Sequence, residues 1–413
     1  AEMSVQRASI ALEPEAGAAL RIPERPGVLL YGSTPSLDLD RWLALAGKDD
    51  SATGPVTVDL KLDTLDAFGK RVTGVTLKAG ADAEGWSANV VADQLAGDLA
   101  YRSADNGKLI ARLARFTIPG DAPRHGAGPL KGEQQVSDLP ALDLIADRFT
   151  FRGKQLGRVE VAAQHAGDDW RIERLAMVNP DASMSGSGIW RGGTASSTGL
   201  NFELKVNDAG KFLDRIGYKE LVKGGKATLG GTISWRGDPL AIDYPSLTGD
   251  LTMNAKDGQF LEIEPGLGKL VSLMSLQMLP RRITLDFRDV FSKGFQFDTI
   301  SSTLQIRQGV MTTSDFKMHG SAADVSMSGE TDLARETQDL TVRVVPGLGD
   351  SASTVIGLLN PLAGVASAIA QRVLKNPLGQ IFSYDYKITG TWTDPDVEKL
   401  RPPAPVDPLL GGY

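Results

Sequence analysis

The chain has 413 residues, of which 41% are hydrophobic and 23% are charged, so it has the composition of a folded protein that can bury a sizeable core. Its net charge of -7 argues against nucleic acid or an anionic membrane surface as an electrostatic partner, because phosphate binding needs a clustered excess of lysine and arginine. The sequence contains no cysteine, which excludes disulfides, thiol nucleophiles and thiolate zinc sites.

The first residues, from Ala1 onwards, have neither the basic nor the apolar region of a secretion signal. No stretch offers about 18 uniformly apolar residues, so we do not expect a conventional transmembrane helix in this sequence. We interpret the chain as part of a longer protein or as a processed form.

Period-two alternation of apolar and polar residues dominates the sequence, in runs bounded by Gly, Asn, Asp or Pro, and this pattern indicates β-strands. One face of each predicted strand is apolar and the other strongly polar. This arrangement favours antiparallel strands with one solvated side. We therefore predict a mainly β protein with a few short helices.

Residues 1–138 are predicted to form a β-rich segment. A short helix is expected over residues 36–46, with Ser36 as its N-cap. Val56, Val58, Leu60 and Leu62 then alternate with polar residues as in a strand. Residues 119–138 are rich in Gly, Pro and charge without periodicity, so we predict a flexible loop there.

Residues 139–400 are predicted to form a second β domain. Residues 172–188 parallel residues 313–329, which suggests two related hairpins, although aligning their SMSG runs requires a short insertion. Repeated hairpins indicate a sheet that grows by addition of strands and buries a continuous apolar face. A helix is predicted over residues 208–223, stopped by Gly224 and Gly225, and another over residues 265–279, ended by Pro280.

The most regular alternation follows Pro280, where apolar residues are separated by polar ones such as Asp286, Gln296 and Lys317. We predict that the apolar residues of this segment share one face. They are Ile283, Leu285, Phe287, Phe295, Phe297, Leu304, Ile306, Phe316 and Met318.

Residues 351–375 are predicted to form two short amphipathic helices, broken at Asn360 and Pro361, which suit an N-cap and a first helical turn. Their apolar residues recur at spacings of three and four: Val355, Leu358, Leu359, Leu362, Val365, Ile369 and Val373. Such a helix pair either packs against the sheet or lies in a membrane interface, and both interpretations stay open. Residues 401–413 form a Pro-rich, solvated tail.

No pattern of catalytic residues stands out. The three histidines lie far apart and outside metal-ligand spacings, so we expect surface or loop positions for them: His125, His165 and His319. Ser187 is not in a GxSxG elbow, and Ala227 stands where a phosphate-binding loop needs a hydroxyl. Asp286 and Asp289 fit cross-strand ion pairs better than an acid and base pair. We predict neither an enzyme nor a cofactor or metal.

The segment LEIEPGLGKLVSLMSLQMLPRRITLDFRDVFSKGFQFDTI, residues 261–300, resembles the signature block of the YhdP branch of the AsmA-like proteins. The resemblance extends to WRIERLAMVNPDASMSGSGIW at residues 170–190 and to YDYKITGTWTDPDV at residues 384–397. It is strong over about residues 139–400 and looser before them. These motifs are structural and do not mark a catalytic site.

The resemblance implies a Gram-negative envelope protein, anchored in the inner membrane by an N-terminal helix that this sequence lacks. It implies an elongated periplasmic body of strongly curved antiparallel β-sheet, shaped like a taco around an apolar groove. The implied function is transport of phospholipid between the inner and outer membranes, with this chain as the part near the outer membrane. Phospholipid acyl chains, the inner leaflet of the outer membrane and envelope proteins are the implied partners, and the apolar residues after Pro280 are the expected groove lining.

The strand pattern fits this function physically. At about 0.8 kcal/mol per CH₂, a sixteen-carbon chain costs on the order of 12 kcal/mol in water, and an apolar trough removes most of that cost.

Two other classes of function stay open. One is a scaffold or outer-membrane protein assembly factor whose sheet edges bind client strands. The other is an enzyme acting on envelope glycans, whose convergent carboxylates the sequence does not show.

Overall fold

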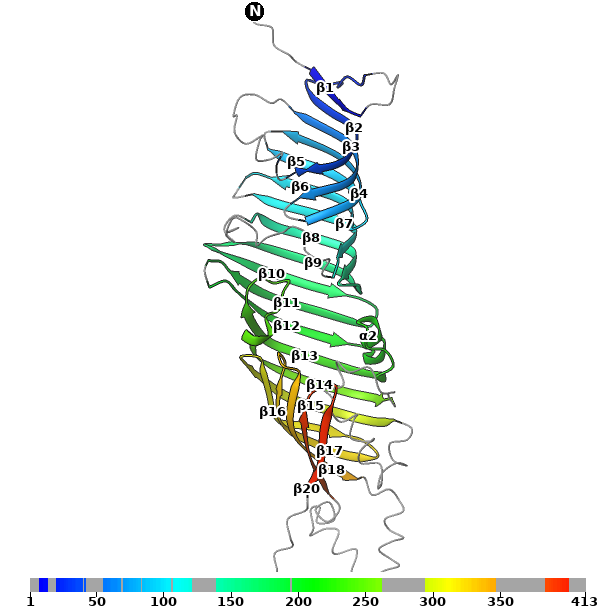
Figure 1. Cartoon of the computed structure of the whole chain (residues 1–413), viewed down its shortest axis with the longest axis vertical. Helices are drawn as coiled ribbons and strands as arrows, with labels where there is room; N and C mark the ends of the chain where they lie inside the picture. Colours follow the sequence, from blue (N-terminus) through cyan, green and yellow to red (C-terminus); the bar gives the residue numbers. More distant parts are fainter. Residues whose placement is uncertain are drawn as a thin grey trace, which may run out of the picture. The chain divides into compact units, whose positions relative to one another are not determined.

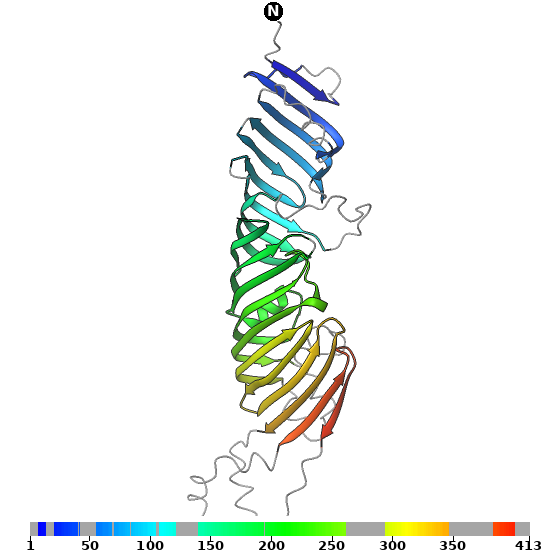
Figure 2. The same ribbon diagram turned by 90° about the vertical axis from the view of Figure 1, so that its left-hand side faces the viewer.

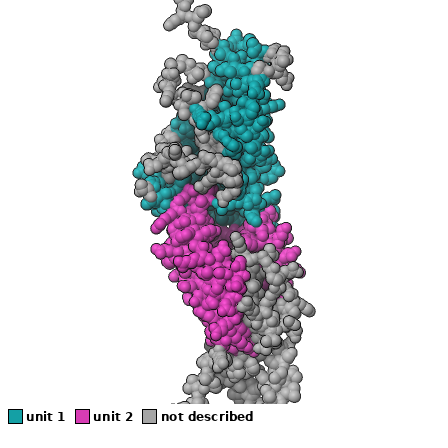
Figure 3. Space-filling model, viewed as in Figure 1, with its two compact units in different colours: residues 1–200 teal, residues 201–413 magenta. Residues whose placement is uncertain are grey.

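The protein, seen here as a computed structural model, is built mainly of β-strands (Figure 1). The structure describes residues 7–13, 20–39, 41, 55–67, 70–82, 84–104, 107–120, 139–193, 195–261, 294–346 and 383–400. Its twenty strands belong to one sheet, which confirms the predicted mainly β class. The chain divides into two compact units, residues 1–200 and 201–413, which Figure 3 colours teal and magenta.

Unit 1 contains eleven complete strands and the start of a twelfth. Strands β1 to β11 pair with their neighbours in chain order. The strands are β1 (Arg7–Leu12), β2 (Gly27–Asp38), β3 (Val56–Ala67), β4 (Lys70–Asp82), β5 (Gly85–Val91), β6 (Leu95–Arg102), β7 (Lys108–Ile118), β8 (Ala141–Phe151), β9 (Lys154–Ala166), β10 (Asp169–Val178), β11 (Ala182–Arg191) and β12 (Ser197–Val206).

The described residues of unit 2 after β12 form one short α-helix and the eight strands β13 to β20, which pair in chain order. Helix α2 packs beside β13 (Figure 2). The elements are α2 (Ala209–Arg215), β13 (Val222–Arg236), the 3-10 turn η2 (Tyr244–Ser246), β14 (Thr248–Phe260), β15 (Phe295–Arg307), β16 (Val310–His319), β17 (Ala323–Asp332), β18 (Thr337–Pro346), β19 (Tyr384–Gly390) and β20 (Pro395–Leu400).

The prediction of an antiparallel sheet is wrong for three of the strand pairs. Strands β1 and β2, β2 and β3, and β7 and β8 pair in parallel. Parallel neighbours need a connection of about a dozen residues or more, because the chain must return to the starting end of the strand. The segment between β7 and β8 includes the predicted loop 119–138. Its length is what a connection between parallel strands requires.

The predicted helix over residues 36–46 begins too early. Ser36 lies in β2, which continues to Asp38. The Asp38 carboxylate accepts a hydrogen bond from the backbone N–H of Arg41 at 2.9 Å, as an N-cap does. Asp38, rather than Ser36, therefore ends the strand and caps the turn that follows.

The predicted helix over residues 208–223 is shorter in the structure. Asp208 caps α2 by accepting from the backbone N–H of Lys211 at 3.1 Å, and the helix ends at Arg215. Gly224 and Gly225 do not stop a helix but lie within β13 at positive φ angles of 63° and 82°. The helical pattern was misleading because the first residues of β13, Val222 and Lys223, fit a helical period as well as a strand.

Several predicted segments lie outside the described residues. They are the helix over residues 265–279, the helix pair over residues 351–375, most of the loop 119–138 and the tail 401–413. The helix pair therefore stays a prediction.

The related segments predicted at residues 172–188 and 313–329 belong to two hairpins, β10 with β11 and β16 with β17. Ile172 pairs with Gly188, and Thr313 pairs with Gly329. Both hairpins also have a register irregularity at the corresponding place, after Ile172 and after Thr313. The two hairpins therefore correspond at one constant offset, and the insertion suggested by the SMSG runs is not needed.

Most buried side chains gather on one face of the strands in each unit, although Leu29 and Tyr31 of β2 are buried on the other face. Unit 1 has two clusters, centred on Leu60 and on Ala146. Unit 2 has one larger cluster that includes Phe297, Val342 and Ile388. Within the described residues, no helix has the length and apolar character needed to span a membrane.

Candidate apolar path

The pairing registers of unit 1 align apolar residues from one strand to the next. Because side chains of a strand point alternately to its two faces, residues paired across strands share a face. One line of paired residues crosses β1 to β11 and contains only Leu, Val, Ala, Met and Gly. We call it the middle row: Leu12, Gly32, Leu60, Leu77, Val90, Gly97, Leu113, Ala146, Val159, Met177 and Met184.

A second row runs beside the middle row, two residues away along each strand, and is apolar from β1 to β10. Its members are Ile10, Leu30, Val58, Ala79, Ala88, Leu99, Ala111, Leu144, Val161 and Leu175. A third row follows on the same face and includes two aromatic residues. Its members are Ala8, Val28, Val56, Ala81, Trp86, Tyr101, Leu109, Leu142, Ala163, Ile172 and Gly188.

Together the three rows form an apolar face without a charged residue among the paired positions. Leu60 and Ala146 are fully buried, whereas Leu77, Leu99 and Leu144 are half-buried. The face therefore combines a tightly packed middle with side chains that keep part of their apolar surface accessible.

Gly97 leaves a gap in the side chains of the middle row, and the structure explains why a glycine is needed there. Its φ is 145°, and a Cβ atom built on it would lie 2.3 Å from the carbonyl oxygen of Arg112. It also stands at the register irregularity between β6 and β7. Glycine allows the two backbones to approach closely where the strands change register.

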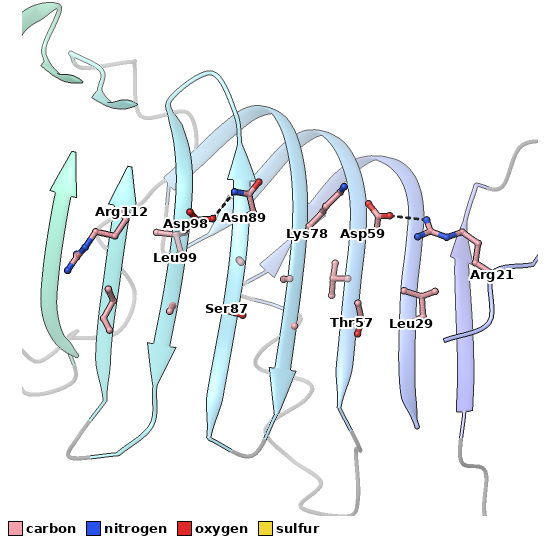
Figure 4. A pocket seen from close by; sticks show the side chains of 16 residues that line it. Arg21, Leu29, Thr57, Asp59, Lys78, Ser87, Asn89, Asp98, Leu99 and Arg112 are labelled. Carbon is pink, nitrogen blue, oxygen red and sulfur yellow. Dashed lines mark hydrogen bonds and ion pairs between the residues drawn. The ribbon is translucent and has the colours of Figure 1, made fainter. Parts of the chain in front are cut away.

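The opposite face of the same strands is polar. Asp59, Lys78, Asn89, Asp98 and Arg112 are paired in that order across β3 to β7, and we call them the polar ladder. Asn89 donates a hydrogen bond to Asp98 at 2.8 Å, as Figure 4 shows. The strands thus separate an apolar face from a face that water and charges can stabilise.

Ion pairs extend the polar face at both ends of the ladder. Arg21 pairs with Asp59 at 2.9 Å, and Arg112 pairs with Asp143 at 2.9 Å. The hydrogen bond from Arg112 is the main cause that holds the pKa of Asp143 below its usual value. Since these pairs are largely exposed, each is expected to contribute well under about 1 kcal/mol to stability.

A cavity of about 780 Å³ lies on the polar face (Figure 4). Paired small residues run through its lining, namely Thr57, Gly80, Ser87 and Ala100. The polar ladder also lines it, and Arg21 lies at one end. Val58, Ala79, Ala88 and Leu99 of the second row belong to its lining as well, so the cavity borders the apolar rows in addition to the polar ladder.

Unit 2 has a comparable apolar row that crosses β13 to β19. Its members are Ala227, Ala255, Ile300, Met318, Val325, Val344 and Tyr384. Around it, Phe297 is 2% exposed and lies against Phe260, with ring centroids 5.1 Å apart. The apolar face of unit 2 is thus bulkier and more completely buried than that of unit 1.

Six of the nine residues predicted to share an apolar face lie in the described part of unit 2. All six are buried: Phe295, Phe297, Leu304, Ile306, Phe316 and Met318. Their polar neighbours Gln296, Asp298, Gln305 and Lys317 are exposed. Ile283, Leu285 and Phe287 lie outside the described residues, as do all the apolar residues predicted between Val355 and Val373. A lipid-binding role for any of these residues remains a prediction.

Strict alternation would place Phe297 and Ile300 on opposite faces of β15, yet both are buried. The phase of alternation changes at Asp298 and Thr299, which are both exposed. The pairing of β14 with β15 is interrupted at the same place, between the pairs formed by Gly258 with Phe297 and Lys256 with Thr299. This irregularity returns the apolar residues to a single face.

The rows of unit 1 were missed by sequence reasoning, which placed its candidate residues only after Pro280. The alternation was visible at Val56, Val58, Leu60 and Leu62, but its continuation across strands depends on the pairing register. Three of the pairings are parallel, and no pattern of neighbouring residues predicts their register.

Of the three histidines, His125 lies outside the described residues, His165 belongs to unit 1 and His319 belongs to unit 2. His319 lies at an exposed position and pairs with Asp324. His165 differs from the expected surface or loop position because it lies in β9, where both ring nitrogens are buried. Within the described ranges, no group of three or more His, Asp or Glu side chains is placed to hold a metal ion.

Comparison with known proteins identifies the family of the chain. The family model described as YhdP protein matches residues 1–397. The chain is 25% identical over 399 residues to the intermembrane phospholipid transporter YhdP of Escherichia coli strain K12, covering 92% of this chain. It spans 31% of that relative's length. No solved structure matches the chain. With a family model matched over nearly its whole length, the chain belongs to the YhdP family.

Proposed function

We propose that the chain is a segment of an intermembrane phospholipid transporter and that its apolar rows hold phospholipid acyl chains during transfer. The observation that carries the proposal is the middle row, in which only apolar residues and glycines are paired from strand to strand across β1 to β11. The name of the Escherichia coli relative supports the same activity, which is that of a protein about three times as long.

The dimensions of the rows suit an acyl chain. Adjacent strands lie about 4.8 Å apart, so a row across eleven strands runs for about 48 Å, several times the roughly 15 Å hydrocarbon thickness of one membrane leaflet. Three rows at about 6.7 Å spacing make a face about 13 Å wide. Two acyl chains can therefore lie side by side across the strands, and can move along the row from one strand to the next.

Transfer along such a face needs no covalent chemistry. Each methylene group gains similar apolar contact at every strand, so no position becomes a deep energy minimum. The polar ladder on the other face keeps the same strands compatible with water. The surface charge of the protein then serves solubility rather than lipid capture.

The finer assignments belong to the same proposal. We place the chain in the periplasm, near the outer membrane, as part of a protein anchored in the inner membrane. We propose that the residues predicted to line a groove after Pro280 bind lipid in unit 2. The amphipathic segment over residues 351–375 is proposed to act at the distal end and to contact the inner leaflet of the outer membrane. Envelope proteins are proposed as further partners.

Leu144 and Ile145 provide the test. They are neighbours in β8, both half-buried, and they point to opposite faces, because Leu144 is in the second row and Ile145 pairs with Arg112 of the polar ladder. Phospholipid that copurifies with the chain would be quantified by mass spectrometry for the wild type, Leu144→Asp and Ile145→Asp. We expect Leu144→Asp to lose most of the bound lipid and Ile145→Asp to keep it. Equal lipid content in two folded variants would contradict the proposal.

A further inference from the structure

The apolar rows of unit 1 end, at one side, in a group of aromatic residues. His165 lies two positions beyond Ala163 of the third row and on the same face of β9. It pairs with Trp170 of β10, which in turn pairs with Trp190 of β11. We call His165, Trp170 and Trp190 the aromatic rim.

The two indoles of the aromatic rim have complete polar contacts. Trp170 and Trp190 meet edge to face with ring centroids 6.4 Å apart. The Trp170 indole N–H donates to the carbonyl oxygen of Pro140 at 3.2 Å, and that of Trp190 donates to the Ser196 hydroxyl at 3.1 Å. Tryptophan favours places where an apolar region borders a polar one, because its ring is apolar and its N–H is polar.

His165 is different, because both of its ring nitrogens are buried and neither has a hydrogen-bond partner among the described residues. An imidazole needs partners at both nitrogens, as donor and acceptor when neutral or as two donors when protonated. Leaving a buried polar group unpaired costs free energy. A partner supplied from outside the chain would remove that cost.

We propose that His165, flanked by Trp170 and Trp190, binds the glycerophosphate part of a phospholipid whose acyl chains lie on the apolar rows. The inference rests on the proposed function and adds the place where the polar part of the lipid is held. An imidazole N–H donates to phosphate or ester oxygens, and hydrogen bonds to a charged acceptor are the stronger kind. The indoles cover the first carbons of the acyl chains next to the glycerol. The lipid thus lies with its polar end at the aromatic rim and its tails across the strands.

The test measures binding of two acyl-labelled fluorescent probes to the full chain, phosphatidylethanolamine and diacylglycerol, which differ by the phosphate-containing headgroup. The wild type is expected to prefer the phospholipid. His165→Phe keeps an aromatic ring without hydrogen-bonding atoms and is expected to weaken phospholipid binding about tenfold, with little change for diacylglycerol. His165→Gln, which keeps a donor and an acceptor, should retain most of the preference. His319→Phe, at an exposed histidine in unit 2, is the control and should match the wild type.

Thermal melting separates binding from folding. Because His165→Phe removes an unpaired buried polar group, its melting temperature should equal or exceed that of the wild type. A lower melting temperature together with equal loss of both probes would assign His165 a structural role and overturn the inference. Competition by millimolar inorganic phosphate would also overturn it, since the site would then bind a free anion rather than a lipid. Wild-type binding of both probes with no effect of His165→Phe would refute the rim site alone, whereas absence of wild-type binding to either probe would refute the proposed function as well.

Discussion

Single residues decide where the backbones of unit 1 can approach each other. At Gly97, a Cβ atom would meet the carbonyl oxygen of Arg112, whereas at Gly80 it would meet nothing within 4 Å. Gly97→Ala should therefore lower the free energy of unfolding by about 1–3 kcal/mol, the usual cost of forcing a side chain into a disfavoured backbone conformation. Gly80→Ala is the matched control and should change stability by no more than about 1 kcal/mol, in the stabilising direction. Urea denaturation of the two variants measures both effects, and equal destabilisation would show that the close approach is unimportant.

The ion pair between Arg343 and Asp385 connects β18 and β19 across paired positions. Two hydrogen bonds join them, at 2.7 Å and 2.9 Å, and the hydrogen bond from Arg343 is the main cause that lowers the pKa of Asp385. A lowered carboxyl pKa in the folded state contributes stability above the unfolded pKa of about 3.9 and loses it as the pH falls through the folded value.

Asp385→Asn should therefore cost up to about 1 kcal/mol at pH 7, because Arg343 is more than half exposed and solvent screens the pair. The difference from the wild type should narrow as the pH falls below about 4. Denaturation curves at pH 7 and pH 3 provide the comparison. A stability difference that does not change with pH would mean that the charge on Asp385 contributes nothing.

Phe297 illustrates the difference between an apolar position and an accessible one. Alternation with polar neighbours identified it as facing inward, but it is 2% exposed and packs against Phe260. A charge at this position would unfold the surrounding cluster, so it cannot report on lipid binding. Half-buried row members such as Leu144 are better probes, and only the structure distinguishes the two kinds of position.

Among the elements, helix α2 depends on its N-cap residue, Asp208. Asp208 accepts the backbone N–H of Lys211, and this hydrogen bond is the largest cause that lowers the pKa of Asp208. Asp208→Ala should reduce the stability of unit 2 by about 1 kcal/mol, whereas Asp208→Asn should lose much less, since asparagine is also a good N-cap. Equal loss in both variants would indicate that the charge matters more than the cap. Guanidinium denaturation followed by circular dichroism gives the comparison.

Some elements could be predicted from neighbouring residues, whereas others depend on contacts between residues far apart in the sequence. The strand around Leu60 was predictable because alternation is a property of neighbouring residues. The parallel pairings of β1 to β3 and of β7 with β8 were not, because direction and register depend on residues far apart in the sequence. The helix predicted over residues 208–223 is correct only in its first half, because Val222 and Lys223 pair in the sheet as the start of β13.

Strand β20 bears on the alternative function as a scaffold for client strands. It is short, begins at Pro395 and carries the charged residues Glu398 and Lys399. Proline and charges are typical of edge strands protected against further pairing. This edge therefore gives little support to client binding by strand addition.

For the molecule as a whole, the central claim is that each unit separates an apolar face from a polar one and that lipid uses the apolar face. The registers of unit 1 define that face strand by strand, and unit 2 has its own apolar row with bulkier, more buried side chains. The family and the pattern of strands could be inferred from the sequence, while the residues of the path in unit 1 required the structure.

Site-specific photo-crosslinking tests this claim most directly. A diazirine side chain would be placed at Leu77 or Leu144 on the apolar rows, and at Lys78 or Ile145, their neighbours on the polar face. After irradiation of the protein in cells, lipid attached to each position would be identified by mass spectrometry. We predict phospholipid adducts at Leu77 and Leu144 and none above background at Lys78 and Ile145. Adducts of equal yield on both faces, or none at Leu77 and Leu144, would contradict the apolar path.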